Sequence, residues 1–194
     1  SGVQETLDYG IYGFAMSRFS GCWVSIKTTA EIMDSSASIS VDTDRIEIAY
    51  PEMEMPEGGL NIRWPDPWLD QELRLHKYKI YAARAFARVN KLDRTIIDGP
   101  KARLGIVTTG KSYLDVRQAL DDLGLDEASA AEVGIRLYKV GMPWPLEPEG
   151  AHAFAEGLEE ILVVEEKRAL IENQLKEQLY NNPAEDRPRV IGKF

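Results

Sequence analysis

The spacing of apolar side chains changes along the chain and divides it into three zones. In residues 1–40, apolar residues recur at helical intervals on both sides of a turn at 20–23, which predicts two short helices. In residues 101–194, short β-branched runs alternate instead with amphipathic stretches of helical length. Residues 41–100 contain elements of both patterns, so we treat them as a separate zone.

The middle zone predicts a strand, a loop and a long helix. Residues 45–50 alternate between polar and apolar and predict one short strand. Residues 51–67 are rich in proline and glycine, which predicts a loop that runs over a surface. A helix is predicted over 68–90, where apolar side chains form two adjacent stripes. Because two stripes indicate burial over a wide face, we expect this helix to be packed between domains.

The last zone predicts an α/β domain. The predicted strands are 103–109, 135–140, 161–165 and 189–192, and the predicted helices are 112–123, 147–157 and 168–180. Strands separated by such helices need right-handed crossovers, which place the strands parallel in one sheet. The predicted fold class is therefore α/β, with three αβα layers around a mostly parallel sheet. A helical extension rich in proline and glycine precedes this domain.

The charge and the cysteine content of the chain limit which binding partners and which cellular compartment we expect. The chain carries 23 basic and 32 acidic residues, a net charge of −9, whereas nucleic acids and anionic membranes need a basic surface. The single cysteine, Cys22, excludes an internal disulfide and an iron–sulfur cluster held by this chain alone, and it fits a reducing cytosol. We expect a cytoplasmic protein that binds neither nucleic acid nor membrane. The chain opens with Ser-Gly-Val instead of Met, so we expect it to be a piece of a longer protein.

One stretch matches a nucleotide-binding motif. Residues 105–112 fit the phosphate-loop pattern G-x-x-x-x-G-K-[ST], and residues 161–166 resemble the apolar strand that ends in a magnesium-binding acid. A nucleotide-binding protein is therefore the alternative function. However, the four residues at 106–109 are all β-branched and favour extended backbone over a curled loop. We interpret them as a strand with Gly105 buried inside it, and the acid after 161–164 as the start of a solvated helix.

The junction between the first strand and helix of this domain holds four candidate anion-binding residues. Thr109, Gly110, Lys111 and Ser112 are predicted at the carboxyl end of a parallel strand and the N-terminus of a helix, where free amides accept anions. The alternative is that Ser112 caps the helix, with Asp115 three residues later in an arrangement close to a capping box. We prefer the cap.

The other candidate side chains do not form a catalytic set. His76 falls on an apolar helical stripe and is predicted to be a hydrogen-bonded core histidine, while His152 is expected to face solvent; two histidines are too few for a zinc site. Cys22 has no nearby histidine and is predicted to be a buried, unreactive thiol. Trp144 stands between two prolines that stiffen the backbone, so we expect it to contact another domain or subunit. We predict no catalytic residue and no metal site.

Several stretches together resemble a known enzyme family. Residues 104–120, LGIVTTGKSYLDVRQAL, resemble the opening strand and helix of the transketolase C-terminal-like domain of 2-oxoacid:ferredoxin oxidoreductases. Residues 141–146 and 161–168 continue the resemblance in order, and residues 12–24 are similar to the tail of a pyrimidine-binding domain. The chain most resembles the indolepyruvate ferredoxin oxidoreductase family in its long single-chain bacterial form.

The resemblance implies a function for the parent protein. Such a protein is a thiamine-diphosphate enzyme that oxidatively decarboxylates arylpyruvates to acyl-CoA and reduces ferredoxin. The implied cofactors are thiamine diphosphate, magnesium, iron–sulfur clusters and coenzyme A, and the implied partners are ferredoxin, the remaining domains of the polypeptide and a second copy. The family's Gly-Asp-Gly magnesium motif and its cysteine clusters are missing here. We therefore expect this segment to bind no cofactor, to be inactive alone and to serve as a structural and interface domain.

The resemblance also implies domain boundaries. We expect residues 1–40 to be the tail of the preceding domain, 41–100 a connector, and 101–194 the transketolase C-terminal-like domain. A domain of that kind has one further helix and strand. Either these follow Phe194, or the missing strand comes from residues 1–100.

Overall fold

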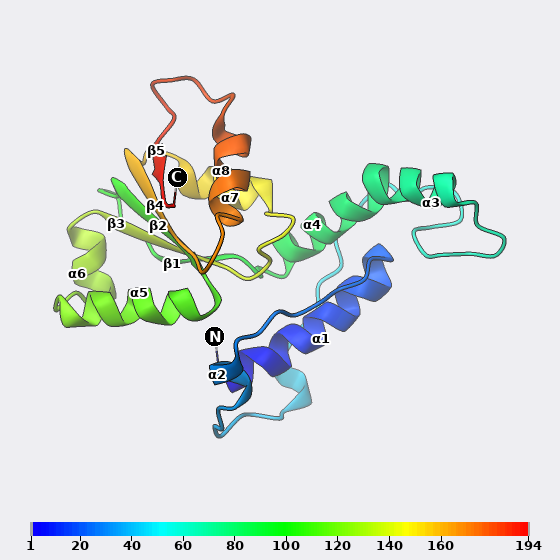
Figure 1. Ribbon diagram of the computed structural model, residues 1–194, viewed down its shortest axis with the longest axis horizontal. Coiled ribbons are helices and arrows are strands. Elements are labelled where there is room, and N and C mark those ends of the chain that lie inside the picture. Colours follow the sequence, from blue (N-terminus) through cyan, green and yellow to red (C-terminus); the bar gives the residue numbers. More distant parts are fainter. Residues whose placement is uncertain (1, 194) are drawn as a thin grey trace. The chain divides into compact units, whose positions relative to one another are not determined.

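A computed structural model describes residues 2–193 of the chain, apart from the side chain of Thr43. It divides into two compact units, Ser1–Lys91 and Leu92–Phe194, which are described separately below (Figure 1). None of the helices within 2–193 is long and apolar enough to cross a lipid bilayer.

The first unit begins with a helix and a sharp turn. Helix α1 (Val3–Ser20) ends at Gly21, whose φ of 69° lies in the left-handed region that glycine adopts without strain. The Gly21 amide donates to the Ser17 carbonyl at 2.9 Å and closes the last turn of α1. A second helix, α2 (Ala30–Met33), follows. The predicted pair of helices with a turn between them is confirmed, but only α2 is short, since α1 has 18 residues.

Residues 68–89 form one continuous helix that contains a π-helical turn. Its parts are α3 (Trp68–Arg74), the π turn η2 (Leu75–Lys79) and α4 (Ile80–Val89). In the π turn, the Ile80 amide donates to the carbonyl of Leu75, five residues earlier. The predicted helix is confirmed, but the predicted wide burial holds only for α4. The buried side chains of α4 are Ala82, Ala83, Phe86 and Ala87, whereas α3 and η2 contribute none.

The strand predicted at 45–50 is wrong. A 3-10 turn, η1 (Thr43–Arg45), is followed there by irregular backbone, because a strand needs a neighbouring strand and the described part of this unit contains none. A side chain satisfies part of this backbone instead. The Asn90 amide group donates to the Ala49 carbonyl at 2.8 Å and accepts from the Ala49 amide at 2.9 Å. Residues 51–67 form the expected loop.

Three aromatic rings hold the first unit together. Phe86 of α4 is fully buried. Its ring centroid lies 6.0 Å from that of Phe19 in α1 and 6.1 Å from that of Tyr50 in the following loop. Phe19 and Tyr50 are themselves 5.8 Å apart. These contacts join α1, α4 and the loop around Phe86, which is the only buried aromatic residue among the described residues of this unit.

The second unit is a three-layer α/β domain, which confirms the predicted fold class. Its five-stranded sheet has the order β1-β3-β2-β4-β5, with β2 to β5 parallel and β1 antiparallel to β3. The strands are β1 (Arg94–Ile97), β2 (Leu104–Thr109), β3 (Ile135–Val140), β4 (Glu160–Val164) and β5 (Arg189–Ile191). The helices are α5 (Gly110–Asp122), α6 (Glu127–Glu132), α7 (Pro148–Ala155) and α8 (Ile171–Leu179).

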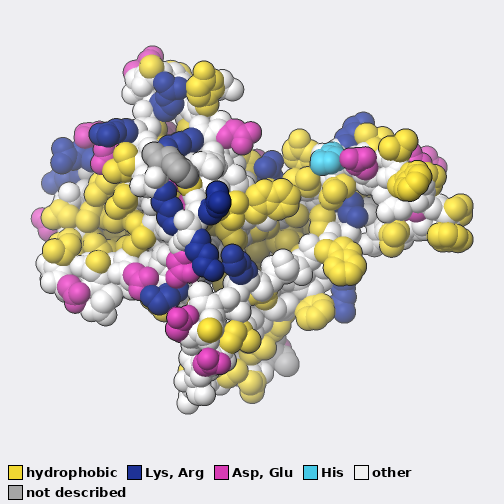
Figure 2. Space-filling view, viewed as in Figure 1, with side chains coloured by type: hydrophobic (Ala, Val, Ile, Leu, Met, Phe, Trp, Pro, Cys, Tyr) yellow, Lys and Arg dark blue, Asp and Glu magenta, His cyan; other side chains and the backbone are white. Residues whose placement is uncertain are grey.

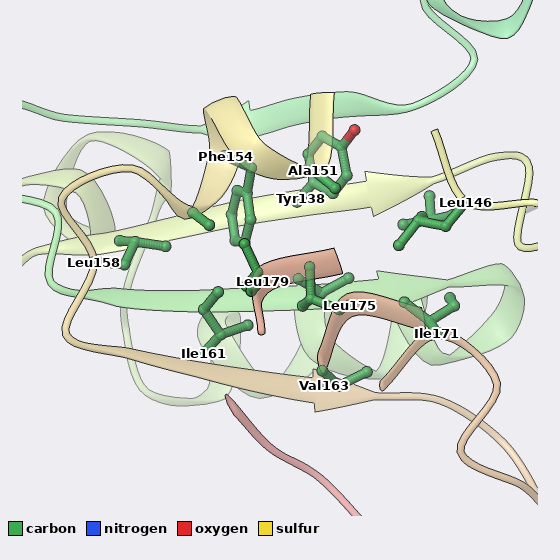
Figure 3. Close-up of a cluster of buried hydrophobic side chains, with 13 residues drawn as sticks. Tyr138, Leu146, Ala151, Phe154, Leu158, Ile161, Val163, Ile171, Leu175 and Leu179 are labelled. Carbon is green, nitrogen blue, oxygen red and sulfur yellow. The ribbon is translucent and has the colours of Figure 1, made fainter. Parts of the chain in front are cut away.

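The sheet buries an apolar cluster on each face. Helices α5 and α6 cover one face and α7 and α8 the other (Figure 1). Figure 3 shows the second cluster, in which the Tyr138 and Phe154 rings stack with centroids 4.9 Å apart. Leu175 and Leu179 of α8 point into the same cluster.

Two elements of the second unit were not predicted from sequence. Strand β1 has only four residues, of which two are exposed, and it belongs to the sheet through antiparallel pairing with β3. It lies within residues 1–100, so the sheet gains a strand from that part of the chain. Helix α6 is a short helix before β3, started by Asp126, whose carboxylate accepts from the Ser129 amide at 2.8 Å.

Candidate functional site

The carboxyl ends of the parallel strands form the candidate site. In parallel α/β sheets, ligands bind at this edge because the loops and helix N-termini converge there. The edge is built here by residues 109–112 after β2, 141–147 after β3 and 165–170 after β4. Because β1 is antiparallel, Asp93 immediately before it lies at the same edge. We refer to these segments as the carboxyl edge.

Strand β2 is straight throughout the segment that matches the phosphate-loop motif. Residues 106–109 pair with β3, and 106–108 also pair with β4, so they form the central strand of the sheet. The interpretation of this segment as a strand is confirmed, and its amides do not curl into a phosphate cradle. Gly105 is buried in this strand, where a Cβ atom would lie 2.5 Å from Leu158 Cδ1 and 2.7 Å from Phe154 Cζ. This glycine is required by core packing.

Helix α5 begins two residues earlier than predicted. Its N-cap residue is Thr109, whose hydroxyl donates to the Val140 carbonyl at 2.8 Å and so does not cap the helix. Ser112 is buried within the first turn, and the predicted cap by Ser112 is therefore wrong. The cap was misplaced because Gly110 enters the helix with a φ of 55°, which shortens the strand-to-helix turn.

Lys111 and Asp115 pair along the surface of α5. Lys111 Nζ lies 2.7 Å from Asp115 Oδ1, one helical turn away, and both side chains are exposed. The structure thus brings the four predicted residues, 109–112, together at the carboxyl edge. The Lys111 side chain pairs within its own helix.

Helix α7 is capped by a buried glutamate. The side chain of Glu147 accepts from the Glu149 amide at 3.1 Å and from the Gly150 amide at 2.6 Å, and only 2% of Glu147 is exposed. A carboxylate at a helix N-terminus is stabilised by the partial positive charge of the free amides. Glu147 therefore occupies the place where an anionic ligand of α7 would bind.

Helix α8 is capped in the same way by Glu165, the acid that follows β4. Its carboxylate accepts from the amides of Leu170, Ile171 and Glu172 at 3.0, 2.9 and 3.1 Å. The interpretation of this acid as the start of a helix is confirmed. Because three amides already bind the carboxylate, Glu165 is a structural cap and not the magnesium-binding acid of a nucleotide site.

The loop after β3 is clamped from α8. Gln174 Nε2 donates to the Pro143 carbonyl at 2.8 Å, and Gln174 Oε1 accepts from the Leu146 amide at 2.8 Å. The loop contains a cis peptide bond between Trp144 and Pro145. Leu146 is 1% exposed and anchors the loop in the core, whereas Trp144 is 63% exposed. The loop therefore presents one indole ring to the outside on a fixed backbone.

Asp93 holds the other end of this loop. Its Oδ1 accepts from the Gly141 amide at 2.7 Å and from the Met142 amide at 3.0 Å, while its Oδ2 is buried and has no hydrogen-bond partner among the described residues. Burial raises the pKa of Asp93 to about 6, and the negative charge of Glu147 adds to this, although the two amides oppose it. Burial, with Asp93 and Glu147 nearby, also raises the pKa of Tyr138.

Sequence reasoning missed Asp93, and its predicted burial was wrong or only partly right for three other side chains. His76 is exposed on the π turn, so its prediction as a core residue is wrong. His152 and Cys22 are both half-buried. Among the described residues, no group of three or more His, Cys, Asp or Glu side chains is arranged to hold a metal ion. The only sequence signal for Asp93 was its place directly before β1, a strand that was itself not predicted.

These observations define an α/β domain whose carboxyl edge is occupied by its own carboxylates and presents an aromatic side chain. Residues 93–194 match the family model described as "Indolepyruvate ferredoxin oxidoreductase middle domain". The chain therefore belongs to the indolepyruvate ferredoxin oxidoreductase family, which confirms the resemblance found in the sequence.

Curated relatives match nearly the whole chain. The indolepyruvate oxidoreductase subunit IorA of Pyrococcus horikoshii is 28% identical over 193 residues, which cover 94% of this chain and 27% of that protein. The protein of the same name from Methanothermobacter thermautotrophicus is 24% identical over 181 residues, which cover 90% of this chain and 27% of that protein. The chain spans about a quarter of the length of these relatives.

Two solved structures are also similar in part. A 2-oxoglutarate:ferredoxin oxidoreductase from Magnetococcus marinus, solved with 2-oxoglutarate, coenzyme A and succinyl-CoA bound, matches with a TM-score of 0.42 and 18% identity. This match covers 78% of this chain and 24% of that one. A split-gene transketolase described as an inactive β4 tetramer matches with a TM-score of 0.37 and 16% identity, covering 52% of this chain and 30% of that one.

Proposed function

We propose that this chain is a structural and interface module of a thiamine-diphosphate-dependent indolepyruvate:ferredoxin oxidoreductase. The parent enzyme would decarboxylate arylpyruvates oxidatively to acyl-CoA and reduce ferredoxin. Membership of the family supports the parent reaction. The observation that carries the structural role is the carboxyl edge, where Glu147 and Glu165 fill two helix N-termini while Trp144 projects from a clamped loop.

We propose that this chain does not hold the family's cofactors. A diphosphate needs free amides or cations, but the amides at the start of α7 and α8 already bind carboxylates. Iron–sulfur clusters need several thiolates, and the chain has only Cys22. We therefore propose that thiamine diphosphate, magnesium, iron–sulfur clusters and coenzyme A bind to other parts of the parent protein. We propose the same for ferredoxin.

The clamped loop is suited to binding a neighbouring domain. Aromatic side chains at the centre of an interface often contribute 2 kcal/mol or more when buried, and a fixed backbone reduces the entropy lost on association. Gln174 and Asp93 supply that rigidity here. Small displacements beside an active site lower reaction rates strongly, so a rigid module can support catalysis without touching the substrate. We propose further that the parent enzyme is cytoplasmic and forms a homo-oligomer.

The test is a substitution of the presented indole in the full-length protein. Trp144→Ala should lower arylpyruvate-dependent reduction of ferredoxin at least about tenfold or weaken assembly, measured by light scattering, and Trp144→Phe should restore most of the loss. The matched control is Tyr180→Ala, which removes another exposed aromatic side chain, beyond the far end of α8. Equal activity and assembly for Trp144→Ala and the control would contradict the proposed interface.

A further inference from the structure

Exposed apolar side chains are concentrated in the first unit. Among the described residues, nineteen large hydrophobic side chains are exposed within 2–91 and six within 92–193. The densest group lies on residues 62–73, and each member is between 61% and 96% exposed. We call this group the aromatic face; it consists of Ile62, Trp64, Trp68, Leu69 and Leu73. Figure 2 shows hydrophobic side chains gathered at the α3 end of the first unit.

The π turn directs the aromatic face away from the core of its own unit. Trp68 precedes Phe86 by 18 residues, which is five turns of an uninterrupted α-helix, so the two would lie on the same side. The turn η2 inserts one extra residue, which rotates α3 by about 100° relative to α4. Because Phe86 is buried within the unit, this rotation leaves the apolar side of α3 for a different partner.

The aromatic face is held in place by its own hydrogen bonds. Asp66 binds the guanidinium of Arg74 and accepts from the Arg63 amide at 3.2 Å. Burial alone would raise the pKa of Asp66, but these contacts hold it below its usual range. Gln71 donates to the Asp66 carbonyl at 2.7 Å, and Arg63 donates to the Gly59 carbonyl at 3.0 Å. The loop that carries Trp64 is thereby fixed to the start of α3.

The size of the aromatic face corresponds to a stable interface. Two nearly fully exposed indoles offer roughly 300–400 Å² of burial. Three exposed aliphatic side chains add roughly 200–300 Å², so the face supplies roughly 500–700 Å² of the ~800 Å² per partner of a standard protein interface. Asp66 and Arg74 beside this face neutralise each other, so the apolar side chains of the face, and not this ion pair, are what a partner groove would cover.

We propose that the aromatic face docks into an apolar groove formed by a part of the same polypeptide outside residues 1–194. The relatives are almost four times as long as the stretch they share with this chain, which is 27% of each protein. A partner on the same polypeptide binds at high effective concentration. This inference rests on the proposed function, because it takes the chain to be one module of the larger enzyme.

The test uses the tryptophans of the aromatic face as reporters. The 194-residue chain has four tryptophans, so the double variant Trp23→Phe, Trp144→Phe leaves only Trp64 and Trp68 to fluoresce in it. In the full reading frame, every tryptophan outside residues 1–194 is also replaced by Phe, so that the same two indoles report in both proteins. Acrylamide quenching should fall at least about threefold from the 194-residue chain to the full reading frame that contains it. Equal quenching in both, or a reading frame that ends with this chain, would overturn the proposal. Low quenching in the 194-residue chain together with a dimeric mass would assign the face to a second copy and overturn it too.

A charged substitution gives an independent test in the full-length protein. Leu73→Glu, in the same two-tryptophan background, should raise quenching toward the value of the 194-residue chain, whereas Leu123→Glu should leave it unchanged. Leu123 is a matched control because it is also an exposed leucine, 73% exposed against 61% for Leu73, at the C-cap of α5. Unchanged quenching in Leu73→Glu would contradict docking. If the full-length protein does not oxidise arylpyruvates but quenching behaves as expected, then the proposed reaction fails while the docking surface stands.

Discussion

The buried carboxyl group of Asp93 should make the stability of the second unit depend on pH. Its Oδ1 accepts two backbone amides of the loop after β3, but its Oδ2 is buried without a hydrogen-bond partner. Two titratable groups interact electrostatically with Asp93, namely the buried Glu147 at the start of α7 and Tyr138 of β3. Replacing Asp93 with Asn keeps one acceptor oxygen for the amides and removes the charge.

The magnitude follows from the pKa. A pKa of about 6 for Asp93 in the folded protein, against an ordinary value of 3.8, corresponds to about 3 kcal/mol. The folded state holds this proton more tightly than the unfolded chain does. Protonated Asp93 therefore contributes its full stabilisation below about pH 4, and this contribution is lost as the pH rises through about 6. At pH 8, the ionised Asp93 side chain lowers the free energy of unfolding.

Urea unfolding of the 194-residue chain between pH 4.5 and 8 measures this effect. Asp93→Asn should be more stable than the unsubstituted chain by about 1–3 kcal/mol at pH 8, and the difference should shrink or reverse near pH 4.5. Asp121→Asn, at an exposed aspartate of α5, is the control and should show no such trend. A difference for Asp93→Asn that stays constant across this pH range would refute the reasoning.

Three further substitutions test the packing and the edge. Gly105→Ala should destabilise the chain by about 1–3 kcal/mol in urea unfolding, because its Cβ would overlap Phe154; no loss would mean that the core has room at this position. Glu165→Ala should cost about 1–2 kcal/mol and speed amide exchange in the first turn of α8, and unchanged exchange would exclude a capping role. Calorimetry should detect no binding of magnesium-ATP; binding that Lys111→Ala abolishes would show that the motif at 105–112 is functional.

The fold of the second unit could be predicted because its strands carry a strong local signal. Parallel strands are buried on both faces and appear in the sequence as continuous apolar runs such as residues 161–164, which is why β4 was predicted to within one residue of its observed bounds. Strand β1 gave no such signal, since it is a half-exposed edge strand that exists only through its pairing with β3. The alternation at 45–50 was misleading for the opposite reason, because it had no strand to pair with.

The location of the candidate site was predictable, but its contacts were not. Residues 109–112 were placed at the carboxyl edge because every parallel strand ends there. Asp93 and Gly141, which form a hydrogen bond, are 48 positions apart in the sequence, so no local sequence pattern could predict their contact. His76 was misplaced because a helical stripe was continued through a π turn, whose extra residue changes the exposed side.

Strand β1 also determines where the second unit can be cut. It shields one edge of β3 and contributes the buried Ile97 to the cluster beneath α5 and α6. A shortened protein that begins at residue 101 would leave the backbone of β3 unpaired along that edge. An unpaired strand edge can form hydrogen bonds with a strand of another molecule, which leads to aggregation. Recombinant or proteolytic fragments should therefore start no later than Leu92 if the isolated domain is to remain monodisperse.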